Sequence, residues 1–504
     1  MYYHWAERIA DEIIKSRKEP YVITGGMTTS GPAHLGTVCE FLFPNAIAKV
    51  LKKRGKEVKF YFVADIMDAF DSIPKSVERY REMLEEHLGK PLYTVPDPFG
   101  CHESFGDHYL SEAIGIMKAM GVETEIVKAQ ELYFSGAFDK YALIFIKNID
   151  KVKEILEKVS KRQLKKTWNP IMPICEKCGK ISTTKVINYE IEGDDVIYEY
   201  ECSNDVGYVK GCGFKGKSSI KKHKYKLQWR LHWPSWWHYF KSSAEGGGVD
   251  HFTKGGSRDT GVVIFKSFFK SEPPIGFKYG FVLLKGKKFS KSKGTGMSVK
   301  EMIELIPAKV VAYHLLKFDL EENIDFNPTK ENILHLIEDY EKTSEIKKEM
   351  DEMSRAERKK WIAYELAGKR EWRGSFREVL MYYQIYKDVS KIKLHLDIDE
   401  KSLRFILPYI KKWIEKEFVP DDYNFSYNPR KAEGSVKEFL SSLKDSMSAL
   451  DIHNFVYEFS RAKGIEPREM FKAIYKTLIG KDRGPRLGKL IYALGVERVK
   501  KDCL

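Results

Sequence analysis

Two short motifs carry side chains that suit a triphosphate: PAHLGT at residues 32–37 and KFSKS, which begins at Lys288. In the first motif, His34 can face a phosphate, and Gly36 lets the backbone approach a nucleotide closely. In the second motif, Lys288 and Lys291 can neutralise the charge that builds up when a carboxylate attacks the α-phosphate of ATP. Such a reaction forms an adenylate and needs no covalent enzyme intermediate.

Further polar groups support this interpretation. Ser290 lies between lysines and permits a tight turn that contacts phosphate, although the segment could also be a solvated basic loop. Asp250, in the Gly-Val-Asp-His run that starts at Gly248, can hold a ribose hydroxyl, and His251 can contact a substrate group; the alternative is a surface turn. The predicted ATP contacts are Pro32, His34, Gly36, Thr37, Asp250, Lys288, Ser290 and Lys291, with His34, Lys288 and Lys291 as the catalytic candidates.

Four of the seven cysteines lie close together in the sequence. Cys175 and Cys178 form a close pair, and Cys202 and Cys212 form a wider pair beyond a predicted hairpin. Two thiolates from one turn and two from another match a tetrahedral structural zinc site. The spacing of the second pair is longer than usual, and a disulfide or free thiols are the alternative.

A second group of metal-ligating residues precedes these cysteines. Asp97, Cys101, His102 and His108 fall within twelve residues, and all four side-chain types bind zinc. The spacing matches no common zinc-finger pattern. Histidines that only form hydrogen bonds within a Gly/Pro-rich loop are therefore the alternative to a second zinc site.

The elements that must position these groups begin with a doubly wound pattern. A strand at residues 21–24 enters a glycine-rich loop, a helix follows from about His34 to Lys53, and an apolar strand covers residues 58–65. Strand, loop, helix and strand form the first unit of a Rossmann-like α/β domain, in which ligands bind beyond the carboxyl ends of the strands.

The rest of the chain departs from this pattern and then returns to it. Clustered cysteines and histidines and a hairpin at residues 186–200 indicate an insertion. Apolar strands are predicted at 261–265 and 279–284, and helical periodicity dominates from about residue 299. The predicted organisation is a catalytic domain in two halves, 1–90 and 226–300, a zinc-binding insertion at 91–225 and an all-α region at 301–504.

Composition points to a nucleic acid as a partner. The 504 residues carry a formal net charge of +14, which favours a polyanion, although a lysine-rich surface of a thermophilic or merely soluble protein is the alternative. No apolar run reaches about 18 residues, and the N-terminus has the pattern of an amphipathic helix. We expect a cytoplasmic protein without a membrane span, in a reducing compartment.

Four segments together resemble class I lysyl-tRNA synthetases, the archaeal and bacterial form related to glutamyl-tRNA synthetase. The resemblance covers roughly residues 1 to 300 and is carried by GGMTTSGPAHLG (25–36), GVDH (248–251), GGSRDTG (255–261) and KFSKS (288–292). It implies ATP with Mg²⁺, L-lysine and tRNA(Lys) as partners, an acceptor-stem contact for the insertion and an anticodon-binding helical C-terminal region.

The resemblance also implies a lysine pocket. Its residues would be Gly26, Thr28, Asp68, Trp229, His251 and Tyr279, with Trp229 and Tyr279 offering aromatic faces to an ammonium group. Most of the aromatic run after Trp229 is expected to be core. One departure concerns Thr37, which stands where the family's first motif ends in a second histidine. Thr37 can donate a hydroxyl but cannot be cationic, so charge stabilisation shifts to the two lysines.

The expected activity is ATP-dependent attachment of lysine to tRNA(Lys) through lysyl-adenylate, by a chain that we expect to be a monomer. Two other functions compete with it. One is a class I relative that charges glutamate or cysteine. The other is a zinc-ribbon RNA-binding protein with an inactive nucleotide site.

Overall fold

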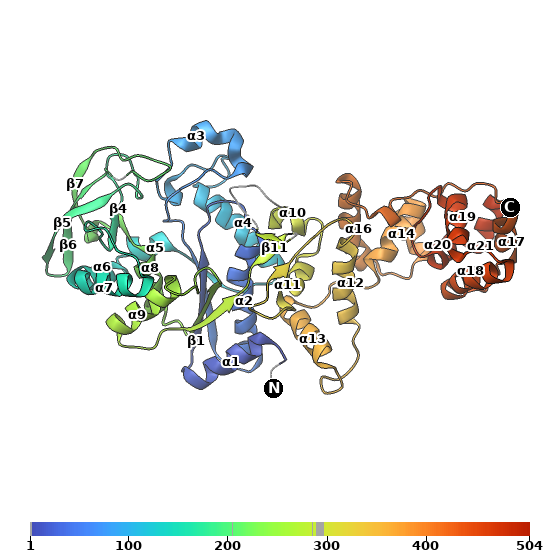
Figure 1. Cartoon of the computed structure of the whole chain (residues 1–504), viewed down its shortest axis with the longest axis horizontal. Coiled ribbons are helices and arrows are strands. Elements are labelled where there is room, and N and C mark those ends of the chain that lie inside the picture. The colour runs from blue at the N-terminus through green and yellow to red at the C-terminus, as the bar shows by residue number, and fades with distance from the viewer. Residues whose placement is uncertain (1–2, 204, 285, 289–296) are drawn as a thin grey trace. The chain divides into compact units, whose positions relative to one another are not determined.

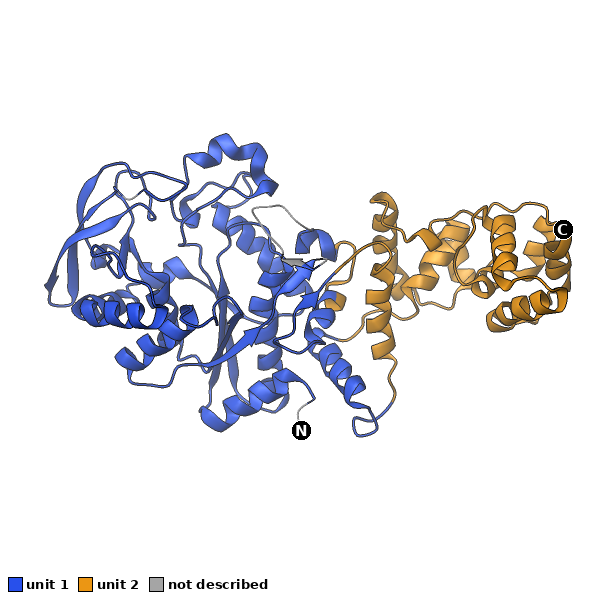
Figure 2. Ribbon diagram, in the orientation of Figure 1, with its two compact units in different colours: residues 1–303, 311–326, 348–368 blue, residues 304–310, 327–347, 369–504 orange. Residues whose placement is uncertain are grey.

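The computed structural model describes residues 3–203, 205–284, 286–288 and 297–504 (Figure 1). The chain divides into two compact units (Figure 2). Unit 1 comprises residues 1–303, 311–326 and 348–368, and unit 2 comprises 304–310, 327–347 and 369–504. Among the described residues, no helix has the length and apolar character required to cross a bilayer.

A parallel sheet of five strands organises unit 1. The strands are β1 (Tyr21–Met27), β2 (Val58–Ala64), β3 (Glu125–Lys128), β9 (Ala244–Gly248) and β10 (Ile275–Tyr279). Their order is β10-β9-β1-β2-β3, and every neighbouring pair is parallel. The chain moves outward from β1 to β3 and returns on the other side of β1, so the strand order reverses between β1 and β9. Ligands of doubly wound folds bind at this switch point.

Helices cover both faces of the sheet. A Cβ on Gly25 would lie 2.6 Å from the backbone oxygen of Glu40 in α2 (Leu35–Lys53), whereas a Cβ on Gly26 would lie 3.1 Å from Trp236 in α8 (Trp229–Phe240). Successive residues of a strand point to opposite faces. Helices α2 and α8 therefore pack on opposite faces of β1, and the two glycines permit their close approach.

Several helices complete unit 1. They are α1 (Trp5–Ser16), α3 (Arg81–Glu85), α4 (Phe105–Ala119), α5 (Ala129–Phe134), α6 (Asp139–Lys147), α7 (Ile149–Ser160), α9 (Ser257–Phe269), α10 (Val299–Ile303), most of α11 (Ala308–Leu316) and α13 (Arg355–Ala367), with 3-10 turns η1 (Lys75–Tyr80), η2 (Leu92–Thr94) and η3 (Ile220–Lys222). Helix α1 buries Ile9 and Ile13 on one side, which confirms the predicted amphipathic helix.

The segment between β3 and β9 contains two antiparallel elements, β4 (Ile171–Pro173) paired with β8 (Tyr225–Leu227), and a three-stranded sheet of β5 (Lys185–Glu192), β6 (Asp195–Glu201) and β7 (Lys215–Ser219). The predicted hairpin is therefore confirmed as β5 and β6. A third small sheet joins β11 (Val282–Leu284) to β12 (Lys287–Lys288) and β13 (Ile324–Asp325).

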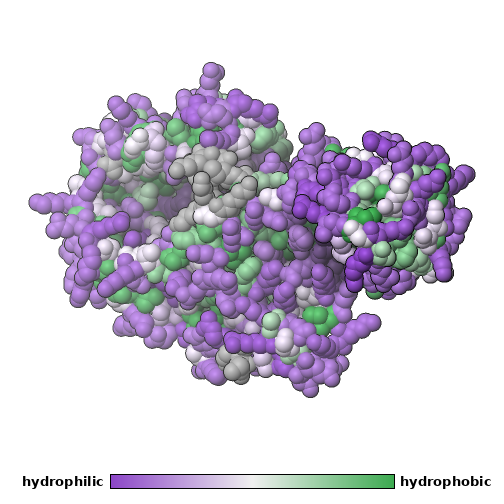
Figure 3. All heavy atoms as spheres, turned by 45° about the vertical axis from the view of Figure 1, so that its right-hand side comes forward, coloured by the Kyte–Doolittle hydropathy of each residue, from purple (hydrophilic) through white to green (hydrophobic). Residues whose placement is uncertain are grey.

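The elements of unit 2 that the structure describes are helices. They are α12 (Ile333–Ser344), α14 (Phe376–Tyr386), α15 (Val389–His395), α16 (Glu400–Glu415), α17 (Gly434–Ser442), α18 (Ala449–Lys463), α19 (Pro467–Ile479), α20 (Leu487–Leu494) and α21 (Val496–Cys503), with the 3-10 turn η4 (Asp421–Tyr423). The face drawn in Figure 3 carries mainly hydrophilic residues, in keeping with a charged fraction of 31%.

Two strand predictions are wrong. Residues 261–265 lie inside the thirteen-residue helix α9, in which Gly261, Ile264 and Phe265 are buried and Val263 is exposed, so the apolar run is not one continuous buried surface. The predicted strand at 279–284 breaks after Tyr279. A Cβ on Gly280 would lie 2.4 Å from the backbone oxygen of Glu322, so the chain passes closely by that backbone and continues as β11 in another sheet.

Two observations bear on the expected regions. Strand β3 pairs with β2, so the alternation of strands and helices continues through α4 and β3, within the residues where we expected an insertion. Residues 311–326 and 348–368, expected in the helical C-terminal region, belong to unit 1.

Candidate active site

Two adjoining cavities open at the carboxyl ends of β1, β9 and β10. The register between β1 and β9 covers only the pairs Ile23–Ala244 and Thr24–Glu245, so the two strands separate beyond them and leave space at the switch point. One cavity, the helix cavity, has a volume of about 290 Å³. The other, the tryptophan cavity, has a volume of about 380 Å³.

The helix cavity takes its name from the first turn of α2. The His34 ring accepts a hydrogen bond at Nδ1 from the backbone N–H of Thr37 (3.3 Å), and the Thr37 hydroxyl accepts one from the backbone N–H of His34 (3.0 Å). Because Nδ1 accepts, the neutral imidazole carries its proton on Nε2. A Cβ at Gly36 would lie 3.0 Å from the His34 ring, so a larger residue there would press on that ring.

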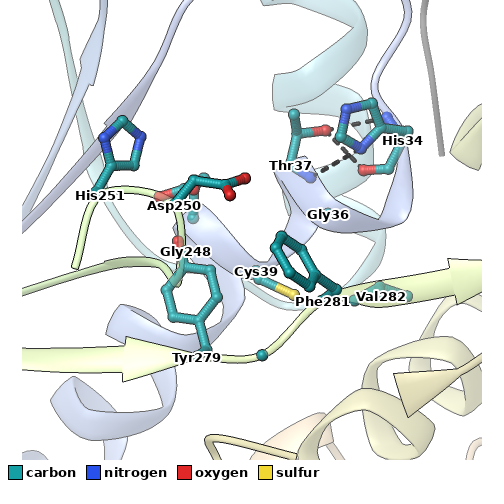
Figure 4. A pocket seen from close by; sticks show the side chains of 12 residues that line it. His34, Gly36, Thr37, Cys39, Gly248, Asp250, His251, Tyr279, Phe281 and Val282 are labelled. Carbon is teal, nitrogen blue, oxygen red and sulfur yellow. Dashed lines mark hydrogen bonds between the residues drawn. The ribbon is translucent and has the colours of Figure 1, made fainter. Parts of the chain in front are cut away.

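The opposite wall of the helix cavity comes from the loop after β9 and from β10 (Figure 4). Asp250 and His251 face the first turn of α2 across the cavity, and Tyr279 and Phe281 lie along its remaining side. The N-terminus of a helix attracts anions through its unpaired N–H groups and its dipole. This arrangement suits a phosphate near α2 and a hydroxylated group near Asp250.

Tryptophans and carboxylates line the other cavity. Its lining residues are Gly26, Met27, Thr28, Thr37, Glu40, Asp68, Trp229, Trp233, Trp236, Glu245, Gly246, Gly247 and His251. Among these described lining residues, three have carboxylate side chains, and none is a lysine or an arginine. A cavity of this composition favours a cationic ligand with an apolar stem.

Glu245 is a buried carboxylate of β9, hydrogen-bonded by neutral donors. Its Oε1 accepts from the indole of Trp233 (2.6 Å), and its Oε2 accepts from Trp236 (2.8 Å) and from the Thr24 hydroxyl (2.5 Å). Burial raises the pKa of Glu245 to about 7, against the effect of these hydrogen bonds. Glu245 therefore fixes the positions of two of the aromatic walls, Trp233 and Trp236.

Glu40, from α2, lines both cavities. Burial is the main cause that raises the pKa of Glu40 to about 8, and the charge of Glu245 adds to it. A cation placed beside Glu40 would reverse this shift, because an opposite charge favours the ionised carboxyl. Thr37 and His251 also line both cavities, so the two ligand sites meet at these three residues.

Aromatic rings close the tryptophan cavity on the side of α8. Trp229 stacks on Trp233 with ring centroids 5.3 Å apart, and its centroid lies 6.1 Å from that of His251. Trp237 is fully buried and lines neither cavity, as expected for a core residue. The aromatic run therefore divides into cavity wall and core along one helix.

Most of the predicted site residues lie at these cavities. Gly26, Thr28, Asp68, Trp229 and His251 line the tryptophan cavity, whereas Tyr279 lines the helix cavity with His34, Gly36, Thr37 and Asp250. Pro32 lines neither cavity. The Thr37 hydroxyl, expected to contact phosphate, closes the cap of α2 and donates to the backbone oxygen of His34 (2.6 Å).

Only the first residue of the second motif, Lys288, is among the described residues. The backbone of Lys288 lies in β12, while Ser290 and Lys291 are outside the described residues. The sequence interpretation also missed residues that the structure brings to the cavities: Glu40, Trp233, Trp236 and Glu245. An acidic residue within an otherwise small and apolar strand, Ala-Glu-Gly-Gly-Gly, was the available signal for Glu245.

The four predicted cysteine ligands converge. Their Sγ atoms all lie within 4.8 Å of one another, with 3.7 Å between Cys175 and Cys212 and 3.7 Å between Cys178 and Cys202. A zinc–sulfur bond of about 2.3 Å in a regular tetrahedron requires sulfur atoms about 3.8 Å apart. The spacing of the four thiols therefore fits a zinc ion.

The second predicted cluster also converges, around Cys101. Its Sγ lies 3.1 Å from Nδ1 of His102 and 3.3 Å from Nδ1 of His108, while Asp97 Oδ2 is 3.3 Å from that nitrogen of His108. Asp97 Oδ2 also accepts from the backbone N–H groups of Cys101 and His102, each at 2.9 Å. The four donor atoms lie within 4.8 Å of one another, and a mixed O, S and N set of this kind suits zinc.

Comparisons with known proteins agree with this geometry. The family model described as tRNA synthetases class I (K) matches residues 3–370. Proteins named lysine–tRNA ligase from Archaeoglobus fulgidus, Thermoplasma acidophilum and Methanocaldococcus jannaschii are 33%, 32% and 31% identical to the chain. These matches cover 99%, 98% and 98% of this chain and 99%, 97% and 98% of the relatives, respectively. The chain therefore belongs to the lysine-type family of class I tRNA synthetases.

Proposed function

We propose that the chain attaches L-lysine to tRNA(Lys) in two steps. The lysine carboxylate attacks the α-phosphate of ATP to give lysyl-adenylate and pyrophosphate, and a terminal ribose hydroxyl of the tRNA then takes the lysyl group. Relatives that match along almost the whole chain carry the name of this activity. No protein nucleophile is required, so catalysis rests on positioning and on charge stabilisation.

The observation that carries the proposal is the charge of the tryptophan cavity. Lysine has two ammonium groups and an apolar stem, and the cavity combines three carboxylates with three indoles. Glu40 is the carboxylate that we assign to an ammonium group, because the oxygens of Glu245 already accept from Thr24 and two indoles. Trp229 offers its ring face to the stem or to the cation.

The helix cavity would take ATP. The first turn of α2, with His34 and Gly36, receives phosphate, and Asp250 receives a ribose hydroxyl. Lys288 and Lys291 are proposed to neutralise the pyrophosphate, with Mg²⁺ bound to the triphosphate. Since Thr37, Glu40 and His251 line both cavities, the lysine carboxylate and the α-phosphate would meet beside them.

Other regions would serve the tRNA. We propose a structural zinc ion at the four cysteines and a second zinc ion at Asp97, Cys101, His102 and His108; each would fix a loop of the region that contacts the acceptor stem. The helices of unit 2 would read the anticodon. A monomeric chain and a cytoplasmic location stay predictions.

Metal analysis of the purified protein should find two zinc ions per chain, one of them lost on Cys202→Ser and the other on Asp97→Asn.

A relative that charges glutamate fits the cavity less well. No lysine or arginine lies among the described residues that line the cavity, so the side-chain carboxylate of glutamate would be buried there without a cationic partner. Cysteine would leave most of the cavity of about 380 Å³ unfilled. The charge and the size of the cavity therefore both favour lysine.

Aminoacylation of unfractionated tRNA tests the proposal. With ATP, Mg²⁺ and a labelled amino acid, the protein should charge tRNA with lysine, and the charged species should be tRNA(Lys). Charging with glutamate or cysteine in place of lysine would overturn the substrate assignment. RNA binding without any charging would favour the RNA-binding alternative.

A further inference from the structure

Lys226, in β8, is a lysine buried beside the active site. Its side chain is 3% exposed, and its Nζ donates to Oδ2 of Asp65 (2.7 Å) and to Oδ1 of Asp68. A buried ammonium is costly unless it is paired. Burial alone lowers the pKa of Lys226, but the two carboxylates outweigh this and raise it, so the lysine is cationic.

Asp68 connects this lysine to the tryptophan cavity. While Oδ1 of Asp68 accepts from Lys226, its Oδ2 accepts from the hydroxyl of Thr28 at 2.6 Å. Asp68 and Thr28 both line the cavity, and Lys226 does not. Each carboxylate oxygen of Asp68 thus has its own partner, which fixes the rotation of the carboxylate and the direction of the Thr28 hydroxyl.

The inner side of the network is also fixed by hydrogen bonds. The Tyr133 hydroxyl accepts from the backbone N–H of Leu227 (3.0 Å) and also forms a hydrogen bond with Nδ1 of His232 (2.7 Å). Nε2 of His232 lies 3.7 Å from Oδ2 of Asp65. Burial, with the charge of Lys226, lowers the pKa of His232 well below its usual value. His232 is therefore neutral and leaves Lys226 to balance the two aspartates.

Strand β8 brings Lys226 to the cavity from the cysteine-bearing segment. β8 pairs with β4, which ends two residues before Cys175, and the backbone N–H of Ile174 donates to the backbone oxygen of Lys224 (2.9 Å). Hydrogen bonds through Lys226 and Asp68 therefore connect this segment to Thr28, the residue that follows β1.

We propose that Lys226 is a positioning residue for amino-acid binding, which holds Asp68 and, through it, Thr28 in the arrangement that receives lysine. This inference rests on the proposed function, because it takes the tryptophan cavity as the amino-acid site. The charge of Asp68 is neutralised from within the protein, so Asp68 acts through Thr28 and leaves the substrate ammonium to Glu40.

A purely structural ion pair predicts a different result. Loss of such a pair lowers the free energy of unfolding and the amount of active protein, but it leaves the KM values of the remaining folded enzyme unchanged. A positioning role changes the KM for lysine and leaves the KM for ATP as it is, because the network reaches the tryptophan cavity through Asp68 and Thr28.

The test uses lysine-dependent ATP–pyrophosphate exchange by the full chain. The Asp65→Asn/Lys226→Gln double variant removes both charges of the buried pair while it keeps groups that can form hydrogen bonds. We expect the KM for lysine to rise about tenfold to a hundredfold, with the KM for ATP unchanged. Lys226→Arg keeps the cation and should recover part of the loss. Lys224→Gln, at an exposed position of the same segment, is the control and should match the wild type.

Each outcome decides between the alternatives. An unchanged KM for lysine, or an equal rise of both KM values, overturns the positioning role. If the double variant fails to fold, Lys226→Arg alone carries the test, since its guanidinium keeps the charge but changes the geometry of the contact with Oδ1 of Asp68; it should raise the KM for lysine to an intermediate value with no effect on ATP, and no change overturns the inference. If the wild-type chain shows no lysine-dependent exchange, the proposed function is overturned as well. If the wild type shows exchange but the variants have the wild-type KM for lysine, only this inference is overturned.

Discussion

The two adjoining cavities differ in the groups that line them, although they share one edge of one sheet. The helix cavity is built on the first turn of α2, whose N–H groups and dipole favour an anion. The tryptophan cavity has three carboxylates and no lysine or arginine among its described lining residues. The helix cavity also has two carboxylates, Glu40 and Asp250, so its preference for an anion depends on the N-terminus of α2. In the proposed function, the amino acid and the nucleotide are distinguished at the boundary between the cavities, where Thr37, Glu40 and His251 lie.

The largest effect should come from the helix cavity. His34→Asn keeps a side chain that can cap α2 but removes the imidazole. We expect the kcat of pyrophosphate exchange to fall about 10²- to 10³-fold, with the KM for lysine little changed. His335→Ala, at an exposed position in α12, is the matched control. A rise confined to the KM for lysine would contradict the separation of the two cavities.

The next largest effect should come from the carboxylate that lines both cavities. Glu40→Gln is isosteric and removes the negative charge, so an ammonium group loses its partner. The KM for lysine should rise about a hundredfold, while the KM for ATP stays within a small factor. Initial-rate kinetics with each substrate varied in turn measure both constants, and Glu123→Gln provides an exposed control. Equal changes in the two constants would show that Glu40 does not discriminate between the sites.

A smaller effect is expected for the aromatic wall. Trp229→Ala removes the ring that stacks on Trp233, and the KM for lysine should rise about tenfold through lost packing and cation–π attraction. Trp229→Phe retains an aromatic face and should restore most of the affinity. If Phe were no better than Ala while the fold stayed intact, the ring face would have no part in binding.

The smallest effect should be a pH dependence of lysine binding. The free enzyme must release a proton from Glu40, whose pKa is raised to about 8, before its carboxylate can pair with an ammonium group. The KM for lysine should therefore fall by up to about tenfold per pH unit as the pH rises toward 8, and then level off. Glu40→Gln should abolish this slope. A slope that survives in that variant would assign the titration to another group.

The sequence predicted the groups that have local signals. His34 and Gly36 follow a strand and begin a helix, and the four cysteines have ligand spacing, so each could be predicted from neighbours along the chain. Glu40 and Glu245 could not, because they become cavity residues only when α2, β1 and β9 pack together. The apolar run at 261–265 was assigned to a strand because periodicity alone does not separate a short buried strand from one side of a helix.

The environment of Lys226 could not be predicted from its neighbours in the sequence either. Its sequence surroundings are basic, yet the pairing of β8 with β4 buries it beside Asp65 and Asp68. Thr37 is an intermediate case. Its position in the motif was recognised, but the structure uses its hydroxyl to cap α2. Local spacing therefore predicted which residues lie at the site better than it predicted what each one contacts.

Pyrophosphate exchange with lysine and two analogues of different charge tests the central claim most directly. Norleucine has the lysine stem without the side-chain ammonium, and glutamate reverses the side-chain charge. Lysine should support exchange with a kcat/KM about a thousandfold or more above that of either analogue, and Glu40→Gln should reduce this ratio. Exchange with norleucine or glutamate as efficient as with lysine would contradict an amino-acid site that selects by charge.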